Sequence, residues 1–133
     1  MTAHETQGKP LTQDELFEAA VQIMLFVDHA ITIRFSKNAF RIRFPTTRKL
    51  ATHFQVPHYY VLPYFATMEK EKLIKREERV GISTTMNGSR KLIDIMVTKY
   101  KKETEAILGT SLFNEIQKRA MTEDKVQDQL PPS

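Results

Sequence analysis

The stretch FPTTRKLATHFQVPHYYVLPYFATMEKEKLI, residues 44–74, decides how the rest of the chain is interpreted. It contains a short amphipathic segment, a turn and a longer amphipathic segment, with apolar residues at helical spacing in both halves. This pattern predicts a helix-turn-helix, in which the second helix enters the DNA major groove and the first helix braces it. An ordinary helical hairpin has the same apolar periodicity, so the spacing alone leaves both interpretations open.

The predicted motif has a small core and recognisable helix ends. Thr46 is the expected N-cap of the first helix, and Gln55 occupies the turn position that tends to adopt positive φ. Pro57 is suited to open the second helix, but Pro63 would then lie in its second turn, where it costs about 3 kcal/mol. We therefore expect the second helix either to kink at Pro63 or to begin later. The apolar residues expected to pack together are Leu50, Ala51, Phe54, Val56, Val61, Phe65 and Met68.

Charge is concentrated around this motif. The 133 residues carry a net charge of +4, yet residues 31–91 hold 13 Lys or Arg and only 4 acidic residues. A basic block that coincides with a predicted helix-turn-helix is expected of a protein that neutralises phosphates, although a solvated basic face would look the same. The composition, 41% hydrophobic and 27% charged, is that of one globular domain.

The chain before the motif begins with a polar segment, residues 1–11, which we expect to be a flexible arm. Thr12 and Glu15 form a predicted capping box that starts a helix with Leu16, Ala20, Ile23 and Val27 buried. Further apolar residues widen this surface, and they could serve either a dimer contact or the core; they are Phe17, Met24, Phe26 and Ile31.

Residues 32–44 alternate apolar and basic residues on both sides of Ser36-Lys37-Asn38, which predicts two short strands joined by a turn. Arg34, Arg41 and Arg43 would point outward, either to DNA phosphates or only to solvent along a soluble edge.

The chain after the motif is expected to form a basic β-hairpin wing around Asn87-Gly88, the strongest two-residue turn signal in the sequence. Its returning strand is expected to end near Ile93. A helix over residues 95–108, stopped by Gly109, and a final helix to about residue 121 would follow, and residues 122–133 are expected to be disordered. The basic residues assigned to the wing are Arg76, Arg79, Arg90 and Lys91.

Residues 44–51, FPTTRKLA, resemble the start of the GntR-type winged-helix motif, and the similarity continues through Val56, Val61 and residues 68–74. A chain of this length without a ligand domain is most similar to the short YtrA-like branch, whose members are dimeric transcriptional regulators. Residues 81–85 and Pro63 depart from the family pattern. The resemblance implies that Arg48 contacts the DNA backbone and that His58, Tyr59 and Tyr60 open the recognition helix.

Signatures of enzymes are missing from the sequence. The four histidines lack the spacing of a helical metal pair, and there is no cysteine, glycine-rich phosphate loop or nucleophile elbow. We therefore expect no catalytic residue, cofactor or metal. Neither a secretory signal nor an apolar stretch long enough for a membrane span is recognisable, so a cytoplasmic protein without membrane contact is expected.

The sequence thus predicts an α+β, mainly helical winged helix-turn-helix with a β-hairpin wing. Residues 12–94 would form the DNA-binding domain, and residues 95–121 would form C-terminal helices that could serve dimerisation. The expected function is sequence-specific binding of double-stranded DNA by a homodimeric transcriptional regulator, most simply a repressor. Two alternatives remain: a plasmid or phage segregation or replication accessory protein, and a protein-interaction module with an aromatic face of Tyr59, Tyr60 and Tyr64. The predicted DNA-binding residues are Arg43, Thr46, Thr47, Arg48, His58, Tyr59, Tyr60, Arg76, Arg79, Arg90 and Lys91.

Overall fold

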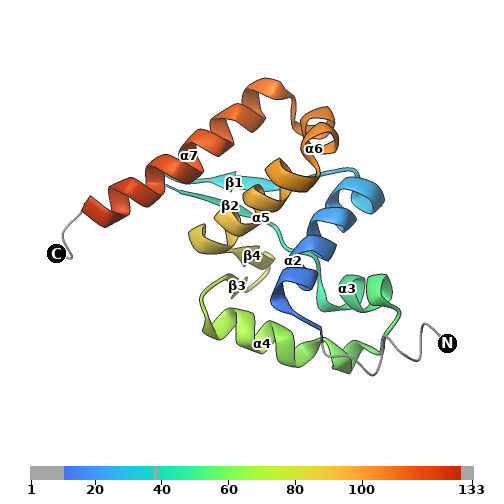
Figure 1. Cartoon of the computed structure of the whole chain (residues 1–133). Coiled ribbons are helices and arrows are strands. Elements are labelled where there is room, and N and C mark those ends of the chain that lie inside the picture. Colours follow the sequence, from blue (N-terminus) through green and yellow to red (C-terminus); the bar gives the residue numbers. More distant parts are fainter. Residues whose placement is uncertain (1–10, 38, 130–133) are drawn as a thin grey trace.

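The computed structural model describes residues 11–37 and 39–129, and its architecture is α+β (Figure 1). Two small antiparallel hairpins, β1–β2 and β3–β4, lie among the helices. Figure 1 places α4 and the β3–β4 hairpin on one side of the molecule and α6 and α7 on the opposite side, with α2 and α5 between them. The predicted combination of helices with a β-hairpin is confirmed at this level.

The first helix, α2 (Gln13–Gln22), begins as predicted. The Thr12 hydroxyl accepts from the Glu15 backbone, and the Glu15 carboxylate accepts from the Thr12 backbone, so the capping box is complete. The helix continues as a π-helical segment, η1 (Ile23–Asp28), which ends at His29 in the left-handed region. The expected burial of Val27 is wrong, because the wider turns of η1 leave this side chain 65% exposed.

The apolar excess on this first helix is divided between core and surface. Phe17 and Met24 are buried in the main core, whereas Phe26 remains half exposed beside Tyr100. Of the predicted arm, residues 1–10 lie outside the described residues. The Leu11 backbone N–H donates to the Tyr64 hydroxyl at 2.9 Å.

The predicted strand pair is present as β1 (Ile33–Phe35) and β2 (Phe40–Ile42). Of its predicted turn, Asn38 lies outside the described residues, and Ser36 N–H donates to the Ala39 carbonyl. Directly after β2, Arg43 bridges Ser83, and Phe44 N–H donates to the Ile82 carbonyl, so this segment runs beside the second hairpin.

The opening stretch forms α3 (Thr47–Phe54), a 3-10 turn η2 (His58–Tyr60) and α4 (Leu62–Lys70). Thr46 caps α3 through Lys49 N–H, and Gln55 has φ of 58°, as expected from the turn. Of the two expected outcomes at Pro63, the later helix start is confirmed, and Pro57 does not open α4. Because α4 begins at Leu62, Pro63 lies in its first turn, where a missing N–H removes no helical hydrogen bond.

The second hairpin consists of β3 (Ile74–Glu77) and β4 (Gly81–Thr84), and its turn lies at residues 78–80. The predicted turn at Asn87-Gly88 is therefore wrong. These residues belong to α5 (Met86–Lys99), where the Thr85 hydroxyl accepts from Gly88 N–H as the helix cap. The expected returning strand to Ile93 is helical for the same reason.

The C-terminal part comprises α6 (Lys101–Leu108), Gly109 as its C-cap and α7 (Thr110–Gln129). The single helix expected over residues 95–108 is thus divided at Tyr100, and Gly109 ends α6 as predicted. The final helix continues past residue 121, so the expected disordered tail begins within α7, and residues 130–133 lie outside the described residues. The predicted division at residue 94 falls inside α5.

One core joins these elements. It includes Phe17 of α2, Phe44 before α3 and Phe65 of α4. The ring of Phe44 contacts Phe17 in a tilted geometry and Phe65 edge to face, with centroids 5.2 and 5.8 Å apart. Buried polar groups also connect the hairpins to α5, since the Thr84 and Ser89 hydroxyls lie 2.7 Å apart and Ile42 N–H donates to Thr84. Both hairpins and α5 are therefore fixed relative to each other.

Candidate nucleic-acid interface

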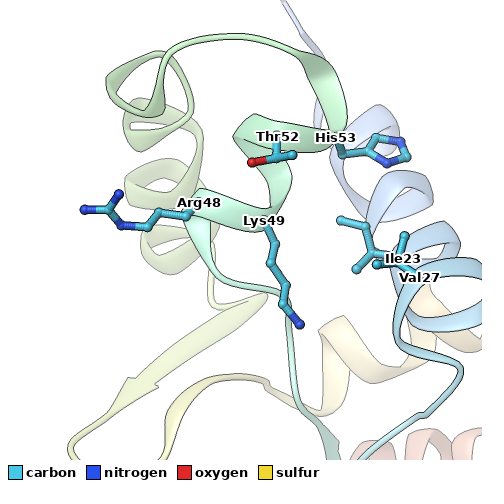
Figure 2. Close-up of a pocket in the computed structure, with 6 residues that line it drawn as sticks. All are labelled: Ile23, Val27, Arg48, Lys49, Thr52 and His53. Carbon is cyan, nitrogen blue, oxygen red and sulfur yellow. The ribbon is translucent and has the colours of Figure 1, made fainter.

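The start of α3 places three predicted site residues together. Thr46 is exposed, and its hydroxyl is used as the helix cap. The Thr47 hydroxyl lies 2.6 Å from Nε2 of His58, which ties the start of α3 to η2. Arg48 is exposed and forms no ion pair with any described residue. In Figure 2, Arg48 points away from Ile23 and Val27, so its guanidinium is available at the surface of α3.

The residues of η2 differ in exposure in the way the sequence predicts. Tyr59 is 71% exposed, His58 and Tyr60 are partly buried, and Val61 is fully buried. Tyr64 is partly buried and its hydroxyl accepts from the Leu11 N–H, so it is less accessible than Tyr59. Tyr59 is therefore the tyrosine of this region that a partner can contact most fully.

The surface of α4 carries few polar groups for reading bases. Leu62, Pro63, Ala66 and Thr67 are exposed, and the Thr67 hydroxyl donates to the Pro63 carbonyl within the helix. Contacts from such a surface would be mainly apolar, and in DNA the thymine methyl group is the partner that suits them.

The β3–β4 hairpin holds two of the four basic residues assigned to it. Nε of Arg76 lies 3.3 Å from Glu69 on α4, which fixes the hairpin against that helix. Arg79 lies at the hairpin turn with φ of 68°, is exposed and has no ion pair among the described residues. Lys75 is also exposed on β3. It is a basic residue of the hairpin that is absent from the predicted site, although it lies in the same basic run of the sequence.

Arg90 and Lys91 lie elsewhere, so their assignment to the wing is wrong. Both belong to α5, because the chain turns into a helix at Thr85. Nε of Arg90 donates to the Ala120 carbonyl on α7, and Lys91 pairs with Asp14 at 2.7 Å. The Lys91 ammonium holds the pKa of the Asp14 carboxyl below its usual range. These cations join helices rather than extend the hairpin.

Arg43 continues the exposed surface toward α3. It lies between β2 and Thr46, is exposed, and has no ion-pair partner in the part of the chain that the structure describes. Lys49, which follows Arg48, instead binds both carboxylate oxygens of Asp28 at 3.0 and 3.1 Å and ties α3 to η1.

A pocket of about 260 Å³ lies between η1 and α3, with Ile23, Val27, Thr52 and His53 in its wall (Figure 2). Burial lowers the pKa of His53, which favours the neutral ring there. The described residues contain no group of three or more His, Asp and Glu side chains placed to hold a metal ion. Arg48 and Lys49 complete the lining of this pocket, so its rim is basic.

Within residues 11–37 and 39–129, every helix is too short or too polar to cross a membrane. Comparisons of the chain with protein-family models, with curated protein sequences and with solved structures give no match.

Proposed function

We propose that the protein is a winged-helix protein that binds double-stranded DNA as a homodimer and acts as a transcriptional regulator, most simply a repressor. The order of elements supports the winged-helix assignment: α2, the β1–β2 hairpin, α3, α4 and the β3–β4 hairpin follow one another, with the short helical segments η1 and η2 between them. The segment at Arg43 and Phe44 runs beside β4, which is where the first strand of such a domain would pair. In this assignment α4 is the recognition helix and the β3–β4 hairpin is the wing.

The observation that carries the DNA proposal is the placement of exposed groups around α4. This helix contacts η2 near its start and β3 near its end, and η2 also contacts α3. Arg48 and Tyr59 therefore lie near one end of α4. The β3–β4 hairpin follows its other end and carries Arg79 in its turn. Arginines can neutralise phosphates and tyrosine can donate to a phosphate or stack on a sugar, so the three groups suit a backbone grip around an inserted helix.

The proposal is tested by measuring binding to mixed fragments of genomic DNA over a salt series. We expect the logarithm of the binding constant to fall linearly with the logarithm of salt concentration, and the slope to decrease by about 0.9 in Arg48→Ala. Tyr59→Ala should weaken binding, and Lys102→Ala, on exposed α6 away from α4, should not. Undetectable binding of the wild-type protein at low salt would contradict DNA binding altogether.

A protein-interaction module is the second candidate, and the exposed apolar surface favours it. Tyr59 is 71% exposed and Leu62 39% exposed, and Pro63, which follows Leu62 in the first turn of α4, is exposed as well. This candidate predicts that Tyr59→Ala abolishes partner binding while Arg48→Ala does not, and that no DNA complex forms at low salt.

The pattern of DNA that the protein protects in a footprint distinguishes a transcriptional regulator from a segregation or replication accessory protein. A regulator should protect one pseudo-palindrome near a promoter, because a twofold dimer binds two half-sites of related sequence. A segregation or replication accessory protein should instead protect an array of repeats.

A further inference from the structure

Two arginines face each other on the outer side of the β1–β2 hairpin. The strand register places Arg34 directly opposite Arg41, and their side chains are 49% and 35% exposed. Like charges in directly opposite positions destabilise a strand pair unless a counter-charge lies between them. The pair therefore requires an anion.

Glu77, the last residue of β3, supplies this anion from the other hairpin. Its Oε1 accepts from Arg34 and its Oε2 accepts from Arg41, each at 2.5 Å. The hydrogen bond from Arg34 keeps the pKa of the Glu77 carboxyl below its ordinary value, and the nearby charge of Lys75 acts in the same direction. Three cations thus surround one carboxylate, and the cluster keeps a positive charge.

Each arginine retains unused donors. A guanidinium has five N–H donors, and Arg34 and Arg41 each direct only one nitrogen to Glu77. Their other N–H groups have no partner among the described residues. Glu77 therefore holds the two guanidinium planes in place without saturating them, as a phosphate site requires.

The cluster is continuous with the surface assigned to DNA. Arg43 lies two residues after Arg41 in extended chain, so the two side chains share one face, and Arg43 leads to Thr46 at the start of α3. Arg79 lies two residues beyond Glu77 at the hairpin turn. Exposed arginines thus run from the β1–β2 hairpin toward both α3 and the turn of the β3–β4 hairpin.

We propose that the outer face of the β1–β2 hairpin is a second contact for the DNA backbone, in which Arg34 and Arg41, oriented by Glu77, bind phosphates beyond those reached by α3 and the β3–β4 hairpin. This inference rests on the proposed DNA binding. It adds two phosphate contacts and makes Glu77 a positioning residue.

The test is the salt slope of DNA binding for Arg34→Ala/Arg41→Ala, measured beside Lys101→Ala/Lys102→Ala, which removes two exposed charges from α6. Two lost phosphate contacts lower the slope by about 1.8, and the control leaves it unchanged. Arg34→Lys/Arg41→Lys retains the slope, because an ammonium also releases a counterion. The alanine pair leaves the Glu77 carboxylate without its two arginine partners. If that double variant unfolds, the slope is measured instead on a triple variant that also carries Glu77→Gln, which removes this charge.

Repeating the measurement in Arg79→Ala protein distinguishes two explanations. Arg34 and Arg41 could contact phosphates directly, or they could act only by positioning the hairpin turn that carries Arg79. Direct contact predicts that the alanine pair lowers the slope by the same amount in this background. Two results would overturn the second contact while leaving DNA binding intact. In the first, the alanine pair does not lower the slope further in the Arg79→Ala background. In the second, the alanine pair in the wild-type background has the same slope as the Lys101→Ala/Lys102→Ala control. If the wild-type protein binds no DNA at low salt, the proposed function fails, and this inference fails with it.

Discussion

At the scale of single residues, Gly88 is the described glycine whose position leaves least room for a side chain. It lies in the first turn of α5, and a Cβ at this position would be 2.0 Å from the Leu73 carbonyl oxygen and 3.1 Å from Cβ of Thr84. The carbonyl belongs to the backbone, and Thr85 N–H donates to the same oxygen, so it has little freedom to move away. Glycine is needed here for close approach between the hairpin and α5.

We expect Gly88→Ala to lower the free energy of unfolding. Alanine has a helix propensity about 1 kcal/mol better than glycine, but overpacking against a fixed backbone costs about 1–3 kcal/mol, and the clash at 2.0 Å is severe. Urea unfolding measures the difference. Asn87→Ala, at the exposed neighbouring position, should change stability far less. Equal stability of Gly88→Ala and wild type would show that the hairpin and α5 are not held this closely.

At the scale of elements, the starts of α2 and α3 were predictable because their signals are local. Thr12 and Thr46 cap their helices through side chains only three residues from the bonded N–H, and Gln55 takes the left-handed conformation that the turn requires. The Asn87-Gly88 turn signal is equally local, but it was misleading. Thr85 caps a helix there, and the need for a glycine comes from Leu73, which is distant in sequence.

The candidate site shows the same difference between local signals, which the sequence reveals, and long-range contacts, which it does not. Arg48 and Tyr59 were assigned to the site from the family resemblance, and both are exposed in the structure. Arg90 and Lys91 could not be placed, because their partners, Ala120 and Asp14, are brought together only by packing of α5 against α7 and α2. Tertiary contacts decide whether a basic residue is available.

The contact of α2 with the junction of α5 and α6 should give stability a defined dependence on pH. Glu18 accepts from Lys99 at 2.9 Å and from the Tyr100 hydroxyl at 2.8 Å, and these bonds hold the pKa of Glu18 below its ordinary value of 4.5. Burial, with a smaller contribution from Glu18, raises the pKa of Tyr100 above 10.0. The Glu18 contribution is therefore present above about pH 4.5 and lost as pH falls through its folded pKa. The Tyr100 contribution is present below about pH 10.0 and lost as pH rises.

Unfolding free energies measured by urea titration across pH should reveal both branches. Glu18→Gln should reduce the loss of stability in acid, with a remainder from Asp14 and Glu77, whose pKa values are also lowered. Tyr100→Phe should reduce the alkaline loss. Glu103→Gln, at an exposed carboxylate with no ion pair among the described residues, is the control. An acid branch unchanged by Glu18→Gln would contradict this role for Glu18.

At the scale of the whole molecule, α7 belongs to the same core as the region assigned to DNA. Phe113 and Ile116 are fully buried, and α7 packs on both α5 and α6. The guanidinium of Arg119 also lies 5.2 Å from the ring centroid of Phe35 on β1. The C-terminal helices therefore support the β1–β2 hairpin and α5, and the domain division expected from sequence at residue 94 interrupts a continuous helix.

This continuity predicts that a cavity in α7 weakens the entire fold. Phe113→Ala should cost about 3–5 kcal/mol, and near- and far-ultraviolet circular dichroism should follow one shared transition to lower urea concentration. Leu112→Ala, at a position already 36% exposed, should cost much less. If α7 were instead an independent dimerisation module, Phe113→Ala would leave the main transition in place and change only the dependence of stability on protein concentration. Two separate unfolding transitions in Phe113→Ala would also contradict a single core. They would support the predicted division into residues 12–94 and 95–121.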